Sequence, residues 1–577
     1  MSSSDQAKAV SPIDGLLALP QDDVRNPVPV MDVGNLFTAD RLLVDVLRQA
    51  GGRWIEPRAK AVGAIMAAEG VDWAERRESP RLQKFDRSGY RIDGIHQSDA
   101  WRQLTATARQ YGLHSLTAVD NRDGVHAARA AMLYTLGQVA PSVIAPISVT
   151  HAGFSVLEQA GQAVQKACFP SLAAVGELGK SAQGSGDHGA SLGLAIAEKH
   201  AVSATAGGEL GFATIAQPIS GRGAGGGAAF ELTGHKWWAV VPQADALIVL
   251  AKSPLGPSCF LVPKQRPDGS RNRIQIQSLT PAFTDAPEAV ASLEFHGAFA
   301  TLIGEEGQGF AVIHPMHQRL MTDQVVVLAA IQRQLLTQLL HVSAHRTKGG
   351  KSQLSDLSVK QTIADLCLEV EAAMRMAMQL AGWLDTPPAH PQLQYLGALA
   401  AKYWLMRRVP MAVTEAMDVV GFHARSDHDR ALDFDGAAAF VALVDGGLGL
   451  EGVNDSVSGQ LCDDALALLR QDRSLGSALM SYLKGIADAH PVLGLHLERL
   501  APVLDSVSDM DQRYGRRALE LIALALQAAV VLPAVPPSIG SLFNQTRLDA
   551  DRGHSLGSSP MPGDLDEVID RLRLQAG

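Results

Sequence analysis

The spacing of hydrophobic positions changes twice along the chain. From residue 31 to residue 191, apolar residues recur every three to four positions, as in LLVDVLRQAG and AMLYTLGQVA, which predicts amphipathic helices. Between residues 192 and 299, short runs of alternating apolar and polar residues are separated by turn-forming segments, which predicts an antiparallel sandwich or barrel. After residue 300 the helical spacing returns and continues to the end. The predicted order is therefore helical, then β, then helical.

Five segments are predicted to be strands, and two long hydrophobic stripes predict the longest helices. The strand-like runs are FELTG, ALIVLAKS, CFLVP, RIQIQSL and VASLEF, with SPLGPS and QRPDGSRN as the turns between some of them. One helical stripe consists of Val325, Leu328, Ile331, Leu335, Leu339 and Val342. A second consists of Val359, Ile363, Leu366, Val370, Ala373, Ala377 and Leu384, on a helix long enough for a bundle.

These changes of pattern divide the chain into five parts. We expect an N-terminal arm (residues 1–30), an N-terminal helical domain (31–191), a middle β domain (192–299), a C-terminal helical bundle (300–472) and a helical extension (473–577). The fold class predicted is mostly α with one inserted β domain.

Composition narrows the class of protein. The 577 residues carry a formal charge of −10, are 46% hydrophobic and only 19% charged, which argues against disorder, collagen and coiled coil. Four widely spaced cysteines give no support to a disulfide framework or a structural zinc site, so we expect reduced thiols and no metal. We find no signal-peptide pattern and no apolar stretch of bilayer length, and we expect a cytoplasmic protein that does not insert in the membrane.

Two short motifs imitate catalytic or cofactor sites. GRGAGG at residues 221–226 matches a dinucleotide-binding fingerprint, but a strand-like run follows it where a helix is required. GHSLG at residues 553–557 matches a nucleophile elbow, but its flanks are polar and do not form a strand and a helix. We expect both to be loops.

A longer set of segments carries a family resemblance. GHKWWAVVPQADALIVLAKS (residues 234–253) resembles the flavin-proximal strand of the acyl-CoA dehydrogenase superfamily, and most closely its AidB-like, alkylation-response branch. Further landmarks follow in the family's order: QKFDRSGYRIDGIHQSDAW, APISVTHAG, GEEGQGFAVI, HQRL and EAMDVVG. The resemblance runs over almost the whole chain.

The resemblance implies an architecture and a chemistry. It implies an N-terminal helical domain, a middle β-barrel and a C-terminal four-helix bundle, with FAD between the β domain and the bundle of a homotetramer. In this family a carboxylate removes the α-proton of an acyl-CoA while the β-hydride goes to the flavin. We therefore expect FAD as cofactor, an acyl-CoA or related substrate, and an oligomer.

The flavin-binding residues that the resemblance implies are spread over the chain. They are Ser203, Gly207, Gly208, Trp237, Trp238, Arg346 and Gly421. Several neighbouring positions depart from the family pattern: Ala204 and Val240 replace polar residues, Gly349 replaces a Phe, and Phe422 replaces a Gly of the phosphate-binding loop.

The catalytic base has two family positions. One is occupied by Gln318, which cannot accept a proton as a carboxylate does, and the other corresponds to the EGVND segment, so that Glu451 is the candidate base and Asp445 the second choice. Arg319 resembles a structural or CoA-side arginine of the family, and a helix-surface ion pair is an equally good interpretation.

Two other functions stay open. The combined departures at Val240, Gly349, Phe422 and Gln318 also fit a flavin-poor paralogue that acts as a binding or scaffold partner. The alkylation-response branch is associated with DNA binding through its C-terminal region. From residue 471 onward, ten Lys and Arg face thirteen Asp and Glu, a net of −3, so DNA binding has weak support.

Overall fold

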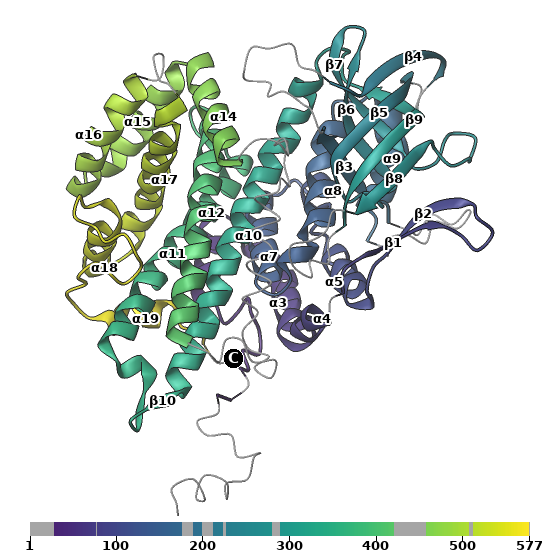
Figure 1. Ribbon diagram of the computed structural model, residues 1–577. Helices are drawn as coiled ribbons and strands as arrows, with labels where there is room; N and C mark the ends of the chain where they lie inside the picture. The colour runs from purple at the N-terminus through teal and green to yellow at the C-terminus, as the bar shows by residue number, and fades with distance from the viewer. Residues whose placement is uncertain are drawn as a thin grey trace, which may run out of the picture.

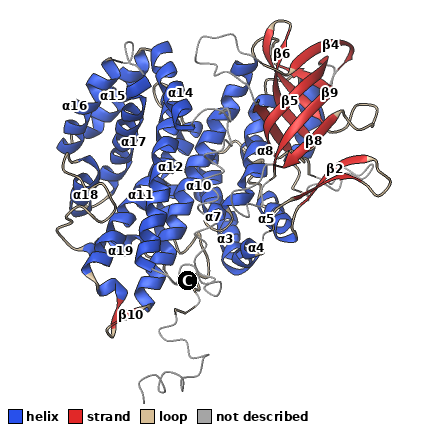
Figure 2. Ribbon diagram, viewed as in Figure 1, coloured by secondary structure: helices blue, strands red, loops and turns tan. Residues whose placement is uncertain are grey.

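The architecture consists of a β-sheet at one side and long helices that fill the rest of the molecule (Figures 1 and 2). The structure, a computed structural model, describes residues 28–29, 31–76, 78–175, 189–198, 212–222, 227–279, 289–420, 457–506 and 512–575. Nearly all of the expected N-terminal arm lies outside these residues. The order helical, β, helical agrees with the sequence pattern, while the expected domain boundaries stay predictions.

The N-terminal part is a set of mostly short helices. They are α2 (Arg41–Gln49), η1 (Gly52–Ile55), α3 (Glu56–Ile65), η2 (Met66–Gly70), α4 (Val71–Glu75), α5 (Asp99–Gln110), α6 (Leu116–Val119), α7 (Val125–Gly137), η3 (Pro141–Val143), α8 (Ile144–Leu157) and α9 (Gln162–Ala173). Every residue of α8 is buried. This helix therefore lies in the interior, where it packs against the sheet on one side and a C-terminal helix on the other.

A hairpin interrupts these helices, which the periodicity did not predict. Its strands are β1 (Arg81–Phe85) and β2 (Arg91–His96), and the segment RSGY at residues 87–90 lies in its turn. The hairpin projects from the body beside the large sheet (Figure 1). Ser98 then starts α5, because its hydroxyl accepts a hydrogen bond from the backbone N–H of Trp101 at 3.2 Å.

The β module is one seven-stranded sheet. Its strands are β3 (Leu192–Ala197), β4 (Ile215–Arg222), β5 (Ala228–Val240), β6 (Ala246–Ser253), β7 (Gly256–Pro263), β8 (Ile274–Leu279) and β9 (Val290–Ile303). The five strand-like runs of the sequence all lie in these strands. The strand order is β3-β5-β4-β6-β7-β9-β8, and additional pairings β3–β6 and β5–β9 fold the sheet back on itself. The expected barrel is therefore a strongly folded sheet rather than a closed barrel.

Alternation along the strands gives the sheet two buried faces. One face forms the module's own core, with Ala195, Ala239, Val249 and Phe260 among its members. The other face belongs to the main core that it shares with the helices. A strand whose two faces are both covered reads as a continuous apolar run, which explains the pattern of ALIVLAKS in β6.

The C-terminal part contains the longest helices. They are α10 (Gly309–His345), α11 (Leu357–Asp385), α12 (Gln392–Val420), α14 (Val457–Gln471), α15 (Ser474–Ala487), α16 (Pro491–Asp505), α17 (Gly515–Val531), α18 (Pro537–Phe543) and α19 (Leu565–Leu572). Shorter elements are β10 (Thr347–Lys348), β11 (Lys351–Ser352), η6 (Gln353–Ser355), η8 (Gln512–Tyr514), η9 (Leu532–Ala534) and η10 (Asn544–Leu548). All members of the first predicted stripe are buried on α10.

The long helices are arranged in layers. α11 and α12 contact each other, and each of them packs against α10 on one side and α17 on the other. By length and composition alone, α10 and the segment Gly515–Ala534 could span a bilayer, but 89% and 72% of their most apolar stretches are buried in the protein. Such burial is typical of the core helices of a globular fold. The expected four-helix bundle remains a prediction within this layered arrangement.

The chain's last described residues return to the long helices. The GHSLG segment is a loop, as expected, and the backbone N–H of Gly557 donates to the carboxylate of Asp365 on α11 at 2.7 Å.

The four cysteines are free thiols, also as expected, and three of them are buried.

Candidate functional site

The face of β5 that looks toward the helices carries Trp238 and Val240. Trp238 pairs with Ala197 of β3, and Val240 pairs with Leu194. Trp238 and Val240 both pack on the core shared with the helices, whereas Ala239 between them belongs to the module's own core. The expected aromatic wall on this face therefore consists of Trp238.

Trp237, the other expected wall residue, lies differently. Its side chain is 37% exposed, and its backbone carbonyl accepts a hydrogen bond from Ser292 at 3.4 Å. Successive residues of a strand point to opposite sides, so the two tryptophans cannot contact the same flat ligand face. Only Trp238 lies at the junction of the sheet and the helices.

Val240 is 2% exposed. A hydroxyl at this position would be enclosed by apolar neighbours, so the apolar residue is consistent with its surroundings. The junction closes on this side because β3 rests on α8: the backbone N–H of Leu192 donates to Thr150 at 3.2 Å. A Cβ on Gly153 of α8 would lie 2.5 Å from the end of the Leu192 side chain, so a larger residue there would displace that side chain.

A buried ion pair fixes the other end of the junction. Lys236 Nζ lies 2.6 Å from Glu198 Oε1, and neither side chain is exposed. Glu198 also accepts the backbone N–H groups of Ala213 at 2.5 Å and Thr214 at 3.2 Å. Burial by itself raises the pKa of Glu198, but Lys236 and these hydrogen bonds outweigh it and lower that pKa; burial lowers the pKa of Lys236.

The sequence reasoning missed this pair. A lysine inside an apolar strand was the available signal, because a buried lysine needs a partner. Glu198 directly precedes residues 199–211, which carry the expected Ser203, Gly207 and Gly208. Those three positions lie outside the described residues. The pair fixes Glu198 itself, which follows Ala197, the residue that pairs with Trp238.

Aromatic rings extend the junction to the first turn of α10. The Phe212 and Phe310 ring centres are 6.2 Å apart, and the Lys236 ammonium lies 5.4 Å from the Phe212 ring centre. Phe310 is 38% exposed. Trp238 Nε1 is buried and has no hydrogen-bond partner among the described residues. The junction thus offers aromatic surface to a planar ligand, next to an indole N–H that is buried without a partner.

Arg346 lies far from this surface. It follows α10, whose 37 residues span about 54 Å, while Phe310 lies in the first turn of the same helix. The Arg346 guanidinium donates to the backbone carbonyl of Val420, the last residue of α12. Gly421 follows directly but lies outside the described residues. Arg346 and Trp238 of one chain are therefore not brought together.

The expected base cannot be placed. Glu451 and Asp445 lie outside the described residues, as does Phe422. Gln318 is half-buried on α10. Its neighbour Arg319 lies 3.8 Å from Glu158, the residue after α8, and its side chain is 18% exposed. The ion-pair interpretation of Arg319 therefore agrees with the structure.

A buried polar group between α7, α8 and α10 was not predicted. Arg129 forms two hydrogen bonds to Asp323, at 2.6 and 2.9 Å. Close by, the rings of His126 and His151 are 6.1 Å apart, and burial lowers the pKa of His126 to about 3 and that of His151 well below its usual value. Both imidazoles are thus neutral near neutral pH. They can accept or donate hydrogen bonds but do not compensate charge.

Comparison with known proteins adds the family. Residues 26–175 match the AidB N-terminal domain of the adaptive response protein, and residues 307–433 match the acyl-CoA dehydrogenase C-terminal domain. The chain is 27% identical over 401 residues to a protein of Escherichia coli K12 named putative acyl-CoA dehydrogenase AidB, with 68% of this chain and 72% of the relative covered. The chain therefore carries an AidB-type N-terminal domain and an acyl-CoA dehydrogenase C-terminal domain, and it is similar to AidB.

Solved structures show the same fold. Caenorhabditis elegans ACDH-11 in complex with C11-CoA superimposes on this AidB-like chain with a TM-score of 0.75 at 18% identity, covering 97% of this chain and 94% of the other. A Bacillus anthracis acyl-CoA dehydrogenase complexed with FAD gives a TM-score of 0.60 at 14% identity, covering 90% and 86%. The acyl-CoA dehydrogenase-like fold implied by the landmark segments is thus confirmed.

Proposed function

We propose that this AidB-like protein is an FAD-dependent flavoprotein of the acyl-CoA dehydrogenase type, with an acyl-CoA or a related thioester as substrate. The names of its relatives support this proposal, since one is bound to C11-CoA and another to FAD. The observation that carries it is Trp238, an aromatic side chain with an unused buried N–H at the junction of sheet and helices.

The residues of this chain suit a flavin in part. Trp238 would form the wall, and Ser203, Gly207 and Gly208 would form the loop beside it. When bound, FAD supplies the acceptor for the β-hydride of the acyl chain. Glu451 would accept the α-proton, with Asp445 as the second choice. The Lys236–Glu198 pair would act only by holding β3 and β5 in register at the wall.

Arg346 and Gly421 would contact a flavin that is bound to a second copy of this chain. Because α10 separates Arg346 from the wall of its own chain by about 50 Å, the arginine could reach only a flavin bound to another protomer. This supports a homo-oligomer, which the family resemblance puts at a tetramer with a four-helix bundle in each chain. We propose a cytoplasmic location on the sequence pattern alone.

The first experiment is an absorption spectrum of the purified protein, followed by titration with FAD. We expect flavin bands and near-stoichiometric FAD in the wild type, and a loss of at least tenfold in FAD affinity in Trp238→Ala. Trp237→Ala is the matched control, because that side chain lies on the other side of β5. Equal loss in both variants, or no flavin affinity at all, would exclude the proposed wall.

The second experiment tests the chemistry. Anaerobic addition of acyl-CoA thioesters of different chain lengths should bleach the flavin in the wild type and not in Glu451→Gln, while both keep their FAD. Full bleaching in Glu451→Gln with unchanged rate would rule out Glu451 and direct attention to Asp445.

The scaffold alternative has one specific observation in its favour. Val240 is enclosed and offers a flavin no hydrogen bond. A folded, oligomeric protein that neither contains nor binds FAD would establish that alternative. DNA binding keeps its weak standing: Arg516 and Arg517 are exposed at the start of α17, and the absence of any duplex DNA binding at low salt would remove it.

A further inference from the structure

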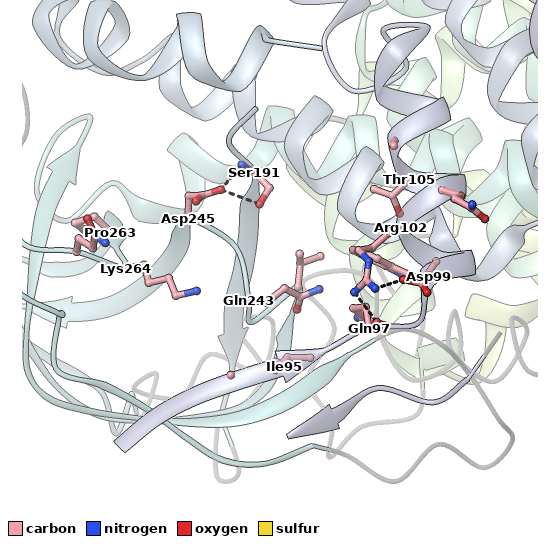
Figure 3. Close-up of a pocket in the computed structure, with 16 residues that line it drawn as sticks. Ile95, Gln97, Asp99, Arg102, Thr105, Ser191, Gln243, Asp245, Pro263 and Lys264 are labelled. Atoms are coloured by element: carbon pink, nitrogen blue, oxygen red, sulfur yellow. Dashed lines mark hydrogen bonds and ion pairs between the residues drawn. The ribbon is translucent and has the colours of Figure 1, made fainter. Parts of the chain in front are cut away.

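A cavity lies outside the junction described above. It occupies about 1100 Å³ between the root of the β1–β2 hairpin, α5 and the sheet (Figure 3). Among its lining residues are Ile95 of the hairpin, Thr105 of α5, and Ser191 and Gln243 at the near end of the sheet. Trp238, Phe212 and Phe310 are not among them. The cavity is large enough for a small organic ligand, for which pockets are typically about 300–1,000 Å³.

The walls are held in place by specific contacts. Asp93 of the hairpin accepts hydrogen bonds from Arg91 at 3.0 Å, from Arg271 at 2.6 Å and from the backbone N–H of Ile276 at 3.3 Å. This cluster fastens the hairpin to the large sheet. On the sheet side, Asp245 accepts the backbone N–H and the hydroxyl of Ser191, at 2.8 and 3.2 Å (Figure 3). The cavity is therefore preformed by three separate elements.

Backbone strain is concentrated at this cavity. Asp93 has a φ of +44° and Val241 a φ of +55°, and no other non-glycine residue of the described chain has a positive φ. Val241 lines the cavity, and Asp93 directly precedes the lining residue Gly94. A β-branched residue is especially unfavourable in this conformation. Strained residues of this kind persist only where the surrounding structure enforces them, and they cluster at ligand-binding sites.

Unsatisfied polar groups gather in the same walls. Both amide atoms of Gln97, the indole N–H of Trp101, the hydroxyl of Thr105 and the amide oxygen of Gln243 are buried without a hydrogen-bond partner among the described residues. All four residues line the cavity. Buried polar groups left without partners destabilise a fold, and small rotations of these four lining side chains would let an occupant of the adjoining space supply the partners.

The charges of the walls identify the class of occupant. The charged lining residues are two acids, Asp99 and Asp245, and two bases, Arg102 and Lys264. Asp99 is paired with Arg102, and Asp245 accepts hydrogen bonds from Ser191. A charged ligand would find no net opposite charge there. The unused groups are donors (the indole N–H and an amide NH₂) and acceptors (two amide oxygens), and an amide offers both complementary functions in one neutral group.

We propose that this cavity is a binding site for a neutral, amide-bearing small molecule with an apolar portion. The apolar portion would contact Ile95, Val241 and Pro263 of the wall. The amide would pair with Gln97 and Gln243 and with the indole N–H of Trp101. This site is independent of the flavin function proposed above.

The probe for the test is N-acetyl-L-phenylalaninamide, and its free acid, N-acetyl-L-phenylalanine, is the charged counterpart. In calorimetric titration of the full-length protein we expect the amide to bind and the acid to bind at least tenfold more weakly. Gln243→Leu should reduce amide affinity at least tenfold and Thr105→Val by about threefold. Hydrogen exchange should show protection of residues 91–106 on binding. Failure of the wild type to bind the amide, or equal binding of the acid, would overturn the proposal.

Matched controls separate binding from folding. Thr107→Val changes the same residue type on α5 away from the cavity, and Gln110→Leu changes an exposed amide at the end of that helix; both should bind like the wild type. Without ligand, Gln243→Leu and Thr105→Val should melt at or above the wild-type temperature, because each removes an unsatisfied polar group. A lower melting temperature with unchanged binding would assign these groups a structural role and contradict the proposal.

The flavin spectrum distinguishes the two proposals. The cavity variants should retain the wild-type flavin content and acyl-CoA response. Amide binding in a protein without flavin affinity would leave this site standing while the proposed flavin function fails, and the reverse result would remove this site alone.

Discussion

The C-terminal helical layers and the junction between the sheet and the helices are held together by different forces. On the C-terminal side, buried charges connect separate layers: Arg547 of η10 lies 2.6 Å from Asp365 and 2.9 Å from Glu369 of α11. In the β module, the buried pair Lys236–Glu198 connects two strands of the same sheet. The junction between that sheet and the helices is formed mainly by apolar packing.

Because of this difference, the C-terminal layer is held more rigidly than the junction between the sheet and the helices. Breaking a buried ion pair leaves an uncompensated charge, so layers joined by such pairs separate only at high cost. Apolar packing is non-directional and tolerates the insertion of another surface. The C-terminal layer therefore behaves as permanent structure, and the junction at Trp238 is where the proposed FAD would lie.

The largest effect is expected at Arg547. Arg547→Met leaves Asp365 and Glu369, both buried, with one cation fewer, and should lower the free energy of unfolding by about 4–5 kcal/mol. Denaturant unfolding measures this, and hydrogen exchange should rise first in residues 544–572. Arg516→Met, at an exposed arginine of α17, should change stability by less than about 0.5 kcal/mol. Equal effects would mean that the buried pairs do not fix the layer.

A somewhat smaller effect is expected at Lys236. Lys236→Met leaves Glu198 as an unpaired charge, although two backbone N–H groups still stabilise it, and should cost about 3 kcal/mol. The double variant Lys236→Met/Glu198→Leu should recover most of this loss. Exchange should rise in β3 and β5 while the C-terminal layer stays protected. Loss of protection in both regions together would show that the two sides do not behave separately.

Acid should lower the stability of both the N-terminal helices and the C-terminal layer, because each contains a buried histidine. Burial lowers the pKa of His114 to about 3 and that of His496 to about 4, below the value of about 6.5 for an unfolded chain. The unfolded state then binds more protons, so stability is complete above pH 6.5 and falls as pH decreases from 6.5 toward 4. Each histidine contributes about 1.4 kcal/mol per pH unit in this window.

The melting temperature between pH 8 and pH 4.5 measures this dependence. His496→Asn, which removes the titrating group from the C-terminal layer, should make the curve flatter, and His114→Asn should do the same for the N-terminal helices. A curve that is flat from pH 6.5 to 5 in the wild type would contradict the burial of these imidazoles.

The smallest effect on folding is expected at Trp238. Trp238→Phe keeps an aromatic ring and removes the unused indole N–H, so the free energy of unfolding should change by less than about 0.5 kcal/mol. FAD affinity should fall by about 1 kcal/mol, or about fivefold in Kd. Calorimetry with FAD gives the second number. Unchanged affinity would mean that the N–H does not face the cofactor.

The strands and long helices could be predicted because their signals are local. The apolar run ALIVLAKS, which is bounded by turn-forming residues, forms β6, and the stripe from Val325 to Val342 is buried on α10. The hairpin β1–β2 was missed because its strands are short, largely exposed and lack a strong hydrophobic pattern. Asp93 has no signature in the sequence for a different reason: its role depends on Arg271, which lies nearly 180 residues away.

The sequence by itself determined the class of this protein: a mostly helical chain with one β module and the landmark segments of the AidB-like acyl-CoA dehydrogenases, in the right order. Spacing and motif order are properties of neighbouring residues, so they survive without coordinates. Only the tertiary structure decided that Trp238 and not Trp237 faces the helices, that Arg346 lies at the far end of α10, and that strained and unsatisfied residues surround one cavity. These facts depend on which way each side chain points and on contacts between distant segments, which packing alone determines.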